Sequence, residues 1–159
     1  MKNLEELFIS ELKNLYAMEK QIAATMQELK PLNNSDLDKR ISKISNKNSA
    51  DYEVIKALLQ KHSVNPGSTT DSVVAEILTN IKSENSSDIT AKVKEAGQLA
   101  SYNRLMAYKS ANYENTSRMA KTLKMKKARK KLKNILETSL KYQNKVKKLA
   151  KKSIYKEAV

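Results

Sequence analysis

The sequence predicts an all-α protein built as a four-helix bundle, with one short extra helix in the middle connection. Two observations support this fold class. The 159 residues include only two Gly and two Pro, and they are rich in residues that favour helices, such as Leu, Lys, Glu and Ala. Apolar side chains also recur at three- and four-residue steps along four long segments. A chain of this length suits one domain, residues 1–159, with a substantial core.

The first long helix begins near Leu4. Its apolar face continues at three- and four-residue steps as far as Leu29, and Glu19 is a charged residue on that face. Pro31 ends the helix, because proline has no amide hydrogen and clashes with the preceding turn. The face consists of Leu4, Phe8, Leu12, Leu15, Glu19, Ile22, Met26 and Leu29.

The second long helix follows the turn and N-cap at residues 33–36 and ends before Asn65. Its apolar stripe passes through position 50 or 51, so either Ala50 or Asp51 faces inward. The stripe consists of Leu37, Ile41, Ile44, Ile55, Leu58 and Leu59 together with one of those two residues.

The second half of the chain predicts a short helix followed by two more long helices. That helix begins at Thr70–Asp71 and carries apolar residues as far as Ile81. Residues 85–88 then cap a long helix that reaches about Met119. A last apolar stripe from Leu123 to Leu149 predicts the fourth long helix, with Ile135 or Leu136 facing the core.

Several stretches resemble the YciE/YciF family of ferritin-like bacterial proteins. The run from Leu4 to Ile22 is similar to the family's first helix, and residues 36–55 and 93–150 lie along its other long helices. Tyr108 and Tyr113 match two tyrosines of a family signature. The resemblance implies a ferritin-like bundle, a homodimer, an association with stress responses, and a central dimetal site formed by carboxylates and imidazoles.

Most positions of the implied metal ligands hold other residues. Glu19 retains a carboxylate, but the family's Glu-His-Leu-Glu pattern falls on residues 43–46 and its Glu-His-Tyr-Glu pattern on residues 106–109, where Lys109 adds a cation. The paired acids of the last helix fall on residues 138–139. We therefore expect a metal-free, cofactor-free and non-catalytic protein, in which Glu19 bonds to a Tyr or Lys across the bundle.

A residual metal site is the alternative hypothesis. It would use Glu19, Glu53 and Glu137, although Glu53 lies near the end of its stripe, where it faces solvent if the helix is regular. His62 is the single histidine and has no convergent partner in the sequence, so packing near the end of the second helix is its expected role.

Composition also bounds the location of the protein. Cysteine is absent, which excludes disulfides, thiolate metal sites and a cysteine nucleophile. Glu5 and Glu6 interrupt any signal-peptide core, and no apolar run approaches the roughly 18 residues of a membrane span. These features predict a cytoplasmic protein without integral membrane association.

Positive charge is concentrated in one segment. Residues 121–152 contain 14 Lys and Arg and one acid, a net charge of +13, whereas the other residues contain 17 basic and 16 acidic side chains. Such a helix is either a solvated outer face or a surface for nucleic acid, an acidic protein or an anionic membrane. The expected polyanion-binding residues are Lys124, Lys126, Lys127, Arg129, Lys130, Lys131 and Lys133.

Overall fold

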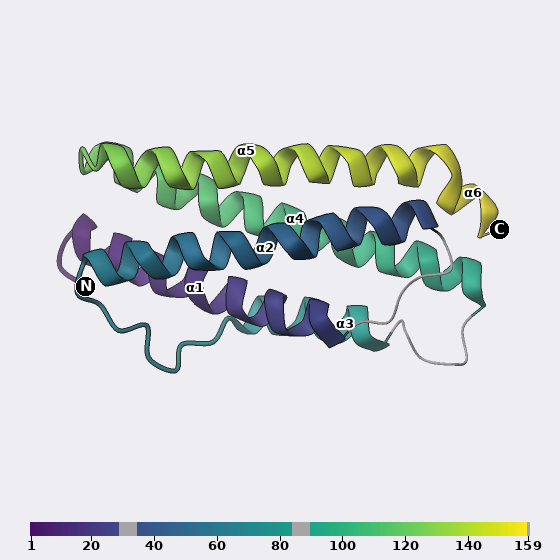
Figure 1. Cartoon of the computed structure of the whole chain (residues 1–159), viewed down its shortest axis with the longest axis horizontal. Coiled ribbons are helices and arrows are strands. Elements are labelled where there is room, and N and C mark those ends of the chain that lie inside the picture. Colours follow the sequence, from purple (N-terminus) through teal and green to yellow (C-terminus); the bar gives the residue numbers. More distant parts are fainter. Residues whose placement is uncertain (29–34, 84–89, 159) are drawn as a thin grey trace.

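Four long helices form the bundle in the computed structural model, which describes residues 1–28, 35–83 and 90–158. These helices are α1 (Leu4–Glu28), α2 (Ser35–Lys61), α4 (Ala91–Thr122) and α5 (Lys126–Leu149). A shorter helix, α3 (Ser72–Ser83), lies in the middle connection (Figure 1). The predicted all-α bundle with one short extra helix is confirmed.

The long helices pack as two antiparallel pairs. In Figure 1, α1 runs beside α2 and α4 runs beside α5, while α3 packs against α1 and α4. The α2 and α5 helices also lie side by side, in opposite directions, and form one outer face of the bundle. One end of the bundle therefore brings together the start of α1, the end of α2 and the start of α5.

Side-chain caps position two helix starts. Asn3 Oδ1 accepts a 2.9 Å hydrogen bond from the Glu6 amide at the start of α1, and Asp71 Oδ1 accepts a 3.0 Å bond from the Val74 amide at the start of α3. Asp71 also exchanges backbone bonds with the Gln21 side chain and accepts a 3.0 Å bond from the Tyr108 hydroxyl. The beginning of α3 is therefore attached to both α1 and α4.

Two helices end in left-handed residues that are not glycine. Ser63 after α2 has a φ of 56°, and Lys124 after α4 has a φ of 57°. In each case the next amide bonds back five residues, from Val64 to Leu59 and from Met125 to Ala120, which is the Schellman arrangement. Glycine is the usual residue at this position because it has no Cβ to strain.

The helix boundaries differ from the prediction mainly in the second half. Leu123 belongs to the C-terminal cap of α4, so α4 reaches Thr122 and α5 begins only at Lys126. After α5 the chain forms a π-helical turn (Ala150–Ile154) and the short α6 (Tyr155–Glu157), neither of which the apolar pattern indicated. The predicted caps at residues 33–34 and 85–88 lie outside the described residues.

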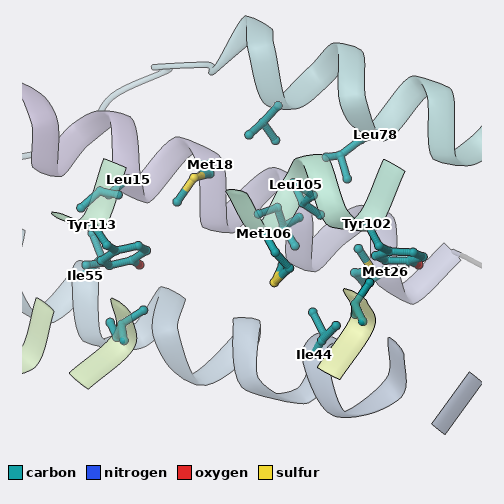
Figure 2. Packing of buried hydrophobic residues seen from close by; sticks show 14 of the residues in the cluster. Leu15, Met18, Met26, Ile44, Ile55, Leu78, Tyr102, Leu105, Met106 and Tyr113 are labelled. Atoms are coloured by element: carbon teal, nitrogen blue, oxygen red, sulfur yellow. Dashed lines mark hydrogen bonds between the residues drawn. The ribbon is translucent and has the colours of Figure 1, made fainter. Parts of the chain in front are cut away.

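One continuous core fills the space between the helices. Figure 2 shows Leu15, Met18 and Ile55 near Tyr113, and Met26 and Ile44 near Tyr102. At the two positions left open by the sequence, Asp51 and Ile135 are buried, whereas Ala50 is exposed and Leu136 half-buried. Among the helices of the described part of the chain, none is long and apolar enough to cross a membrane.

Candidate functional site

A lysine ammonium occupies the centre of the bundle. Lys109 extends from α4 between α1 and α2, and only 1% of the residue is exposed. Its Nζ lies 2.7 Å from Glu19 Oε1, 2.8 Å from Asp51 Oδ2 and 2.7 Å from Asn48 Oδ1. An ammonium has three hydrogens to donate, so these three acceptors satisfy it.

The carboxylate of Glu19 is buried because of its place on the helix. It lies on the inner stripe of α1 between Leu15 and Ile22, and none of its surface is exposed. The Tyr113 hydroxyl, one turn after Lys109 on α4, donates a 2.7 Å hydrogen bond to the same Oε1 atom that Lys109 contacts. The expectation that Glu19 bonds to a Tyr or Lys across the bundle is confirmed with both residues.

The α2 helix supplies the second carboxylate. Asn48 and Asp51 are three residues apart, which places both on the inner face of α2. Asp51 also pairs through its other oxygen, Oδ1, with Lys47 Nζ at 2.8 Å, and the Lys47 side chain is 36% exposed. Two carboxylates are therefore balanced by one buried and one partly exposed ammonium. We call Glu19, Asn48, Asp51, Lys109 and Tyr113 the core ion cluster.

Burial and charge act on the protonation of this cluster in different directions. Burial raises the pKa of Glu19, and Lys109 reduces that rise without cancelling it. For Lys109, burial favours the neutral amine, but the charges of Glu19 and Asp51 outweigh it, so the pKa is raised. Burial raises the pKa of Tyr113 well above its usual value, and the charge of Glu19 adds to the effect. At neutral pH the cluster thus contains a charged lysine and a protonated tyrosine.

These residues do not fit the dimetal centre that a ferritin-like fold implies. Such a centre needs several carboxylates and imidazoles that converge on two cations. Here the two buried carboxylates already face the ammonium of Lys109, so a divalent ion would meet a fixed positive charge within the same shell. In the described residues, no three His, Asp or Glu side chains come together in a group able to hold a metal.

The three residues of the alternative metal site lie in different environments. Glu19 is in the core ion cluster, whereas the side chains of Glu53 and Glu137 are 64% and 59% exposed and pair with Lys56 and Lys133 on their own helices. The structure does not bring them together. Glu53 and Glu137 lie on the outer faces of α2 and α5, because their neighbours Ile55 and Ile135 occupy the inner faces.

The family's Glu-His-Leu-Glu pattern was placed on residues 43–46 of α2, but its polar positions do not lie on the face of α2 that meets Glu19. Lys43 and Asn46 are exposed, and the polar residues that reach the interior are Asn48 and Asp51. On α4 the placement over residues 106–109 does match the inner face, because both Met106 and Lys109 are buried. Ala107, between them in the same pattern, is exposed.

Sequence analysis did not identify Asn48 and Asp51 as members of the cluster. A signal was present, since Asp51 occupies a core position of the stripe and Asn48 lies one turn before it. Lys109 was noted as an added cation, but its partners lie on helices about 60 and 90 residues earlier in the chain. Helical periodicity describes one helix at a time, so it could not show that these residues meet.

The expected polyanion-binding residues are all exposed. They occupy the α4–α5 turn and the first turns of α5. Within the described residues, Lys133 is the one member that forms an ion pair, at 3.3 Å from Glu137.

His62 is half-buried and packs edge-on against Phe8, with ring centroids 6.0 Å apart, so its expected packing role is confirmed.

Comparison with known proteins defines the family. The sequence model of the family described as Domain of unknown function (DUF892) matches residues 3–159. The chain belongs to this family. The resemblance to YciE/YciF proteins is thereby confirmed. A search of curated proteins finds no match for this DUF892 chain.

Two solved structures share the fold of this DUF892 chain. The E. coli stress protein YciF superposes with a TM-score of 0.87 at 23% identity, covering 94% of this chain and 96% of that one. YcfI from Rhodopseudomonas palustris gives a TM-score of 0.84 at 16% identity, covering 92% and 94%. At such identities the likeness shows the ferritin-like bundle fold, and the function of the DUF892 chain has to be argued from its own residues.

Removing the central ammonium should destabilise this DUF892 chain strongly. Lys109→Met leaves Glu19 buried without a cation and leaves Asp51 with Lys47 alone, which costs about 3–5 kcal/mol of unfolding free energy. Changing Glu19 and Asp51 to Leu in the same variant removes the uncompensated charges and should recover most of that loss. Urea denaturation of the single and triple variants measures both effects. Equal stability of Lys109→Met and the unmodified protein would contradict the structural role of the cluster.

The cluster should also make stability fall in alkaline solution. The pKa values of Lys109 and Tyr113 are raised in the folded protein above their ordinary values of 10.5 and 10.0. Above about pH 10 the folded protein therefore holds protons that the unfolded chain has released, so the unfolding free energy falls as pH rises. Urea titrations between about pH 8 and about pH 11 measure the slope. The triple variant, which lacks the buried ions, is the control and should lose less stability over this range.

Proposed function

We propose that this chain is a non-catalytic, metal-independent ferritin-like protein that acts by association with itself or with a partner. The central observation is the ammonium of Lys109 between two buried carboxylates. The ammonium of Lys109 supplies the positive charge that the buried carboxylates of Glu19 and Asp51 require. The bundle then folds without depending on metal supply, and a redox reaction has no set of ligands to support it.

Association is supported by apolar surface at one end of the bundle. Val93 at the start of α4 and Tyr155 in α6 are each 47% exposed. An apolar cavity of about 350 Å³ lies beside Tyr155 and is lined by Leu99, Val146 and Ala150 among others. A homodimer that covers this end is our expectation for the protein. The E. coli relative is called a stress protein, and we extend a stress-associated role to this chain as part of the proposal.

Metal analysis tests the proposal directly. The purified protein should carry no stoichiometric iron or manganese by elemental analysis, and calorimetric titration with either ion should show no saturable heat. The Glu19→Ala variant is the control, because it removes the one family carboxylate that is retained. Stoichiometric binding that disappears in Glu19→Ala would overturn the metal-independent role. Sedimentation of the same sample checks the expected homodimer.

A second candidate function is the binding of a polyanion by α5. The specific observation in its favour is the set of exposed basic side chains at the start of α5, of which only Lys133 has an acidic partner among the described residues. Such cations gain free energy by releasing counterions from phosphate groups, without reading the base sequence. The apolar face of α5 is buried in the bundle, so α5 would contact the outside of the polyanion and not insert into a groove.

Neutralising the start of α5 tests this second candidate. A variant with Gln at Lys126, Lys127, Arg129, Lys130 and Lys131 should lose salt-sensitive retention on DNA, and the slope of log affinity against log salt should fall by about 4–5. A matched control variant carries Gln at Lys2, Lys13, Lys20, Lys82 and Lys156, which lowers the net charge equally. If both variants elute at the same salt concentration as each other, the α5 surface has no special role.

A further inference from the structure

The seam between α2 and α5 contains two separate basic cavities. The larger, of about 360 Å³, lies at the end of the bundle where α2 ends and α5 begins. The smaller, of about 160 Å³, lies near the other end of the same seam, where α2 begins and α5 approaches its last turns. Figure 1 shows that both positions belong to one elongated face, because α2 and α5 run side by side between them.

The larger cavity is lined by cations from two parts of the chain. Lys61 comes from the last turn of α2, while the other basic residues belong to the α4–α5 turn and the first turns of α5. Among the residues that the structure describes, no carboxylate lines this cavity. The basic lining residues are Lys61, Lys124, Lys126, Lys127 and Lys131, and His62 contributes an imidazole beside them.

The smaller cavity depends mainly on α2, which the charge distribution of the sequence did not single out. Its basic residues are Lys39, Arg40 and Lys43 from α2 and Lys145 from α5, and it includes one carboxylate, Asp36. The Nε–H of Arg40 is buried and has no hydrogen-bond acceptor among the described residues. The cavity therefore combines four basic side chains with one carboxylate, which leaves it with a net positive charge.

The spacing of the cavities restricts what can contact both. Arg40 and Lys61 lie on the same helix about 21 residues apart, which at about 1.5 Å per residue is roughly 30 Å. A single small anion cannot bridge this distance. A rigid polymer with regularly spaced negative charges can, because its second contact costs little additional conformational entropy.

We propose that the α2–α5 seam is a binding site for the phosphate backbone of duplex nucleic acid, which contacts the two cavities at once. This inference rests on the second candidate function and extends it from one helix to two. A duplex stays straight over 30 Å, since its persistence length is about 50 nm. Lysine ammonium groups bind phosphate oxygens as point charges, and a guanidinium such as that of Arg40, which lines the smaller cavity, is a planar group whose donors match phosphate geometry.

The acidic groups near the seam do not cancel its charge. Within the described part of the chain, Asp36 is the one carboxylate that lines either cavity. Glu53 pairs with Lys56 on α2, and Glu137 pairs with Lys133 on α5. Asp51, between the two cavities along α2, is buried in the core ion cluster. The surface that a duplex would meet is therefore dominated by cations.

The test compares two pairs of substitutions in the complete protein. Lys39→Gln with Lys43→Gln changes the smaller cavity, while Lys13→Gln with Lys20→Gln removes the same charge from α1, away from the seam. Binding is measured by fluorescence anisotropy with a duplex of about 20 base pairs and with a hairpin of about 6 base pairs, which is roughly 20 Å long at 3.4 Å per pair.

We expect the Lys39 and Lys43 substitutions to weaken binding of the long duplex at least about tenfold. The slope of log affinity against log salt concentration, called the salt slope here, should fall by about 2. The hairpin reaches only one cavity and can still use the larger one, so its affinity should change less. The α1 pair should leave the salt slope for the long duplex unchanged. Circular dichroism confirms that each variant remains folded.

Three results would overturn the inference. Equal effects of the two pairs would mean that only net charge matters. An equal loss for duplex and hairpin would mean that the two cavities are not contacted together. Binding of polyglutamate as tightly as the duplex, with the same loss in the α2 pair, would show that the ligand is not defined by phosphate. In each case a loss of DNA binding in the five-residue α5 variant would still support the second candidate function.

Discussion

The bundle depends on a buried ammonium that compensates two buried carboxylates. A charge in the interior of a protein is unfavourable unless hydrogen bonds and an opposite charge surround it. Lys109 meets this requirement with three acceptors from α1 and α2, and the Tyr113 hydroxyl donates a second hydrogen bond to Glu19 Oε1. Because the acceptors come from two helices and the donors from a third, the cluster fixes how α1, α2 and α4 are aligned with one another.

The same cluster explains how a ferritin-like fold can persist without its usual ligands. The acidic positions in the centre of such a bundle repel one another unless a cation lies between them. Here the cation is covalently attached to α4, so it is always present and always in the same place. Met106, one turn earlier on the same face, packs in the apolar core. The interior of the bundle therefore serves the stability of the fold.

The α5 helix has a different role from the other long helices. The hydrogen bonds and ion pairs described for the core ion cluster come from α1, α2 and α4, whereas the inner face of α5 is a mainly apolar stripe that includes Leu132, Ile135 and Val146. Its outer face carries most of the net charge of the protein. Packing on α4 through apolar residues leaves the basic side chains exposed, and the neighbouring α2 adds Lys39, Arg40, Lys43 and Lys61 to the same face.

The sequence by itself determined the helical class, the number and approximate limits of the long helices, the burial of Glu19 and the concentration of charge in α5. These properties are set by residues close together in the chain, since helical periodicity and local composition report on one helix at a time. Helical periodicity could not decide whether Ala50 or Asp51 faces the core, because consecutive residues differ by only 100° around the helix.

Only the tertiary structure decided what the charged residues do. In the sequence Lys109 is only a cation added to the family's ligand pattern, and its role becomes clear when α1 and α2 place Glu19, Asn48 and Asp51 around it. Glu53 and Glu137 look like members of one acidic set until their helices turn them outward in different places. The basic residues of α2 are scattered in the sequence and become part of one face only because α2 packs beside α5. Electrostatic interactions depend on distance in space, and distance in space between helices is fixed by packing and not by sequence separation.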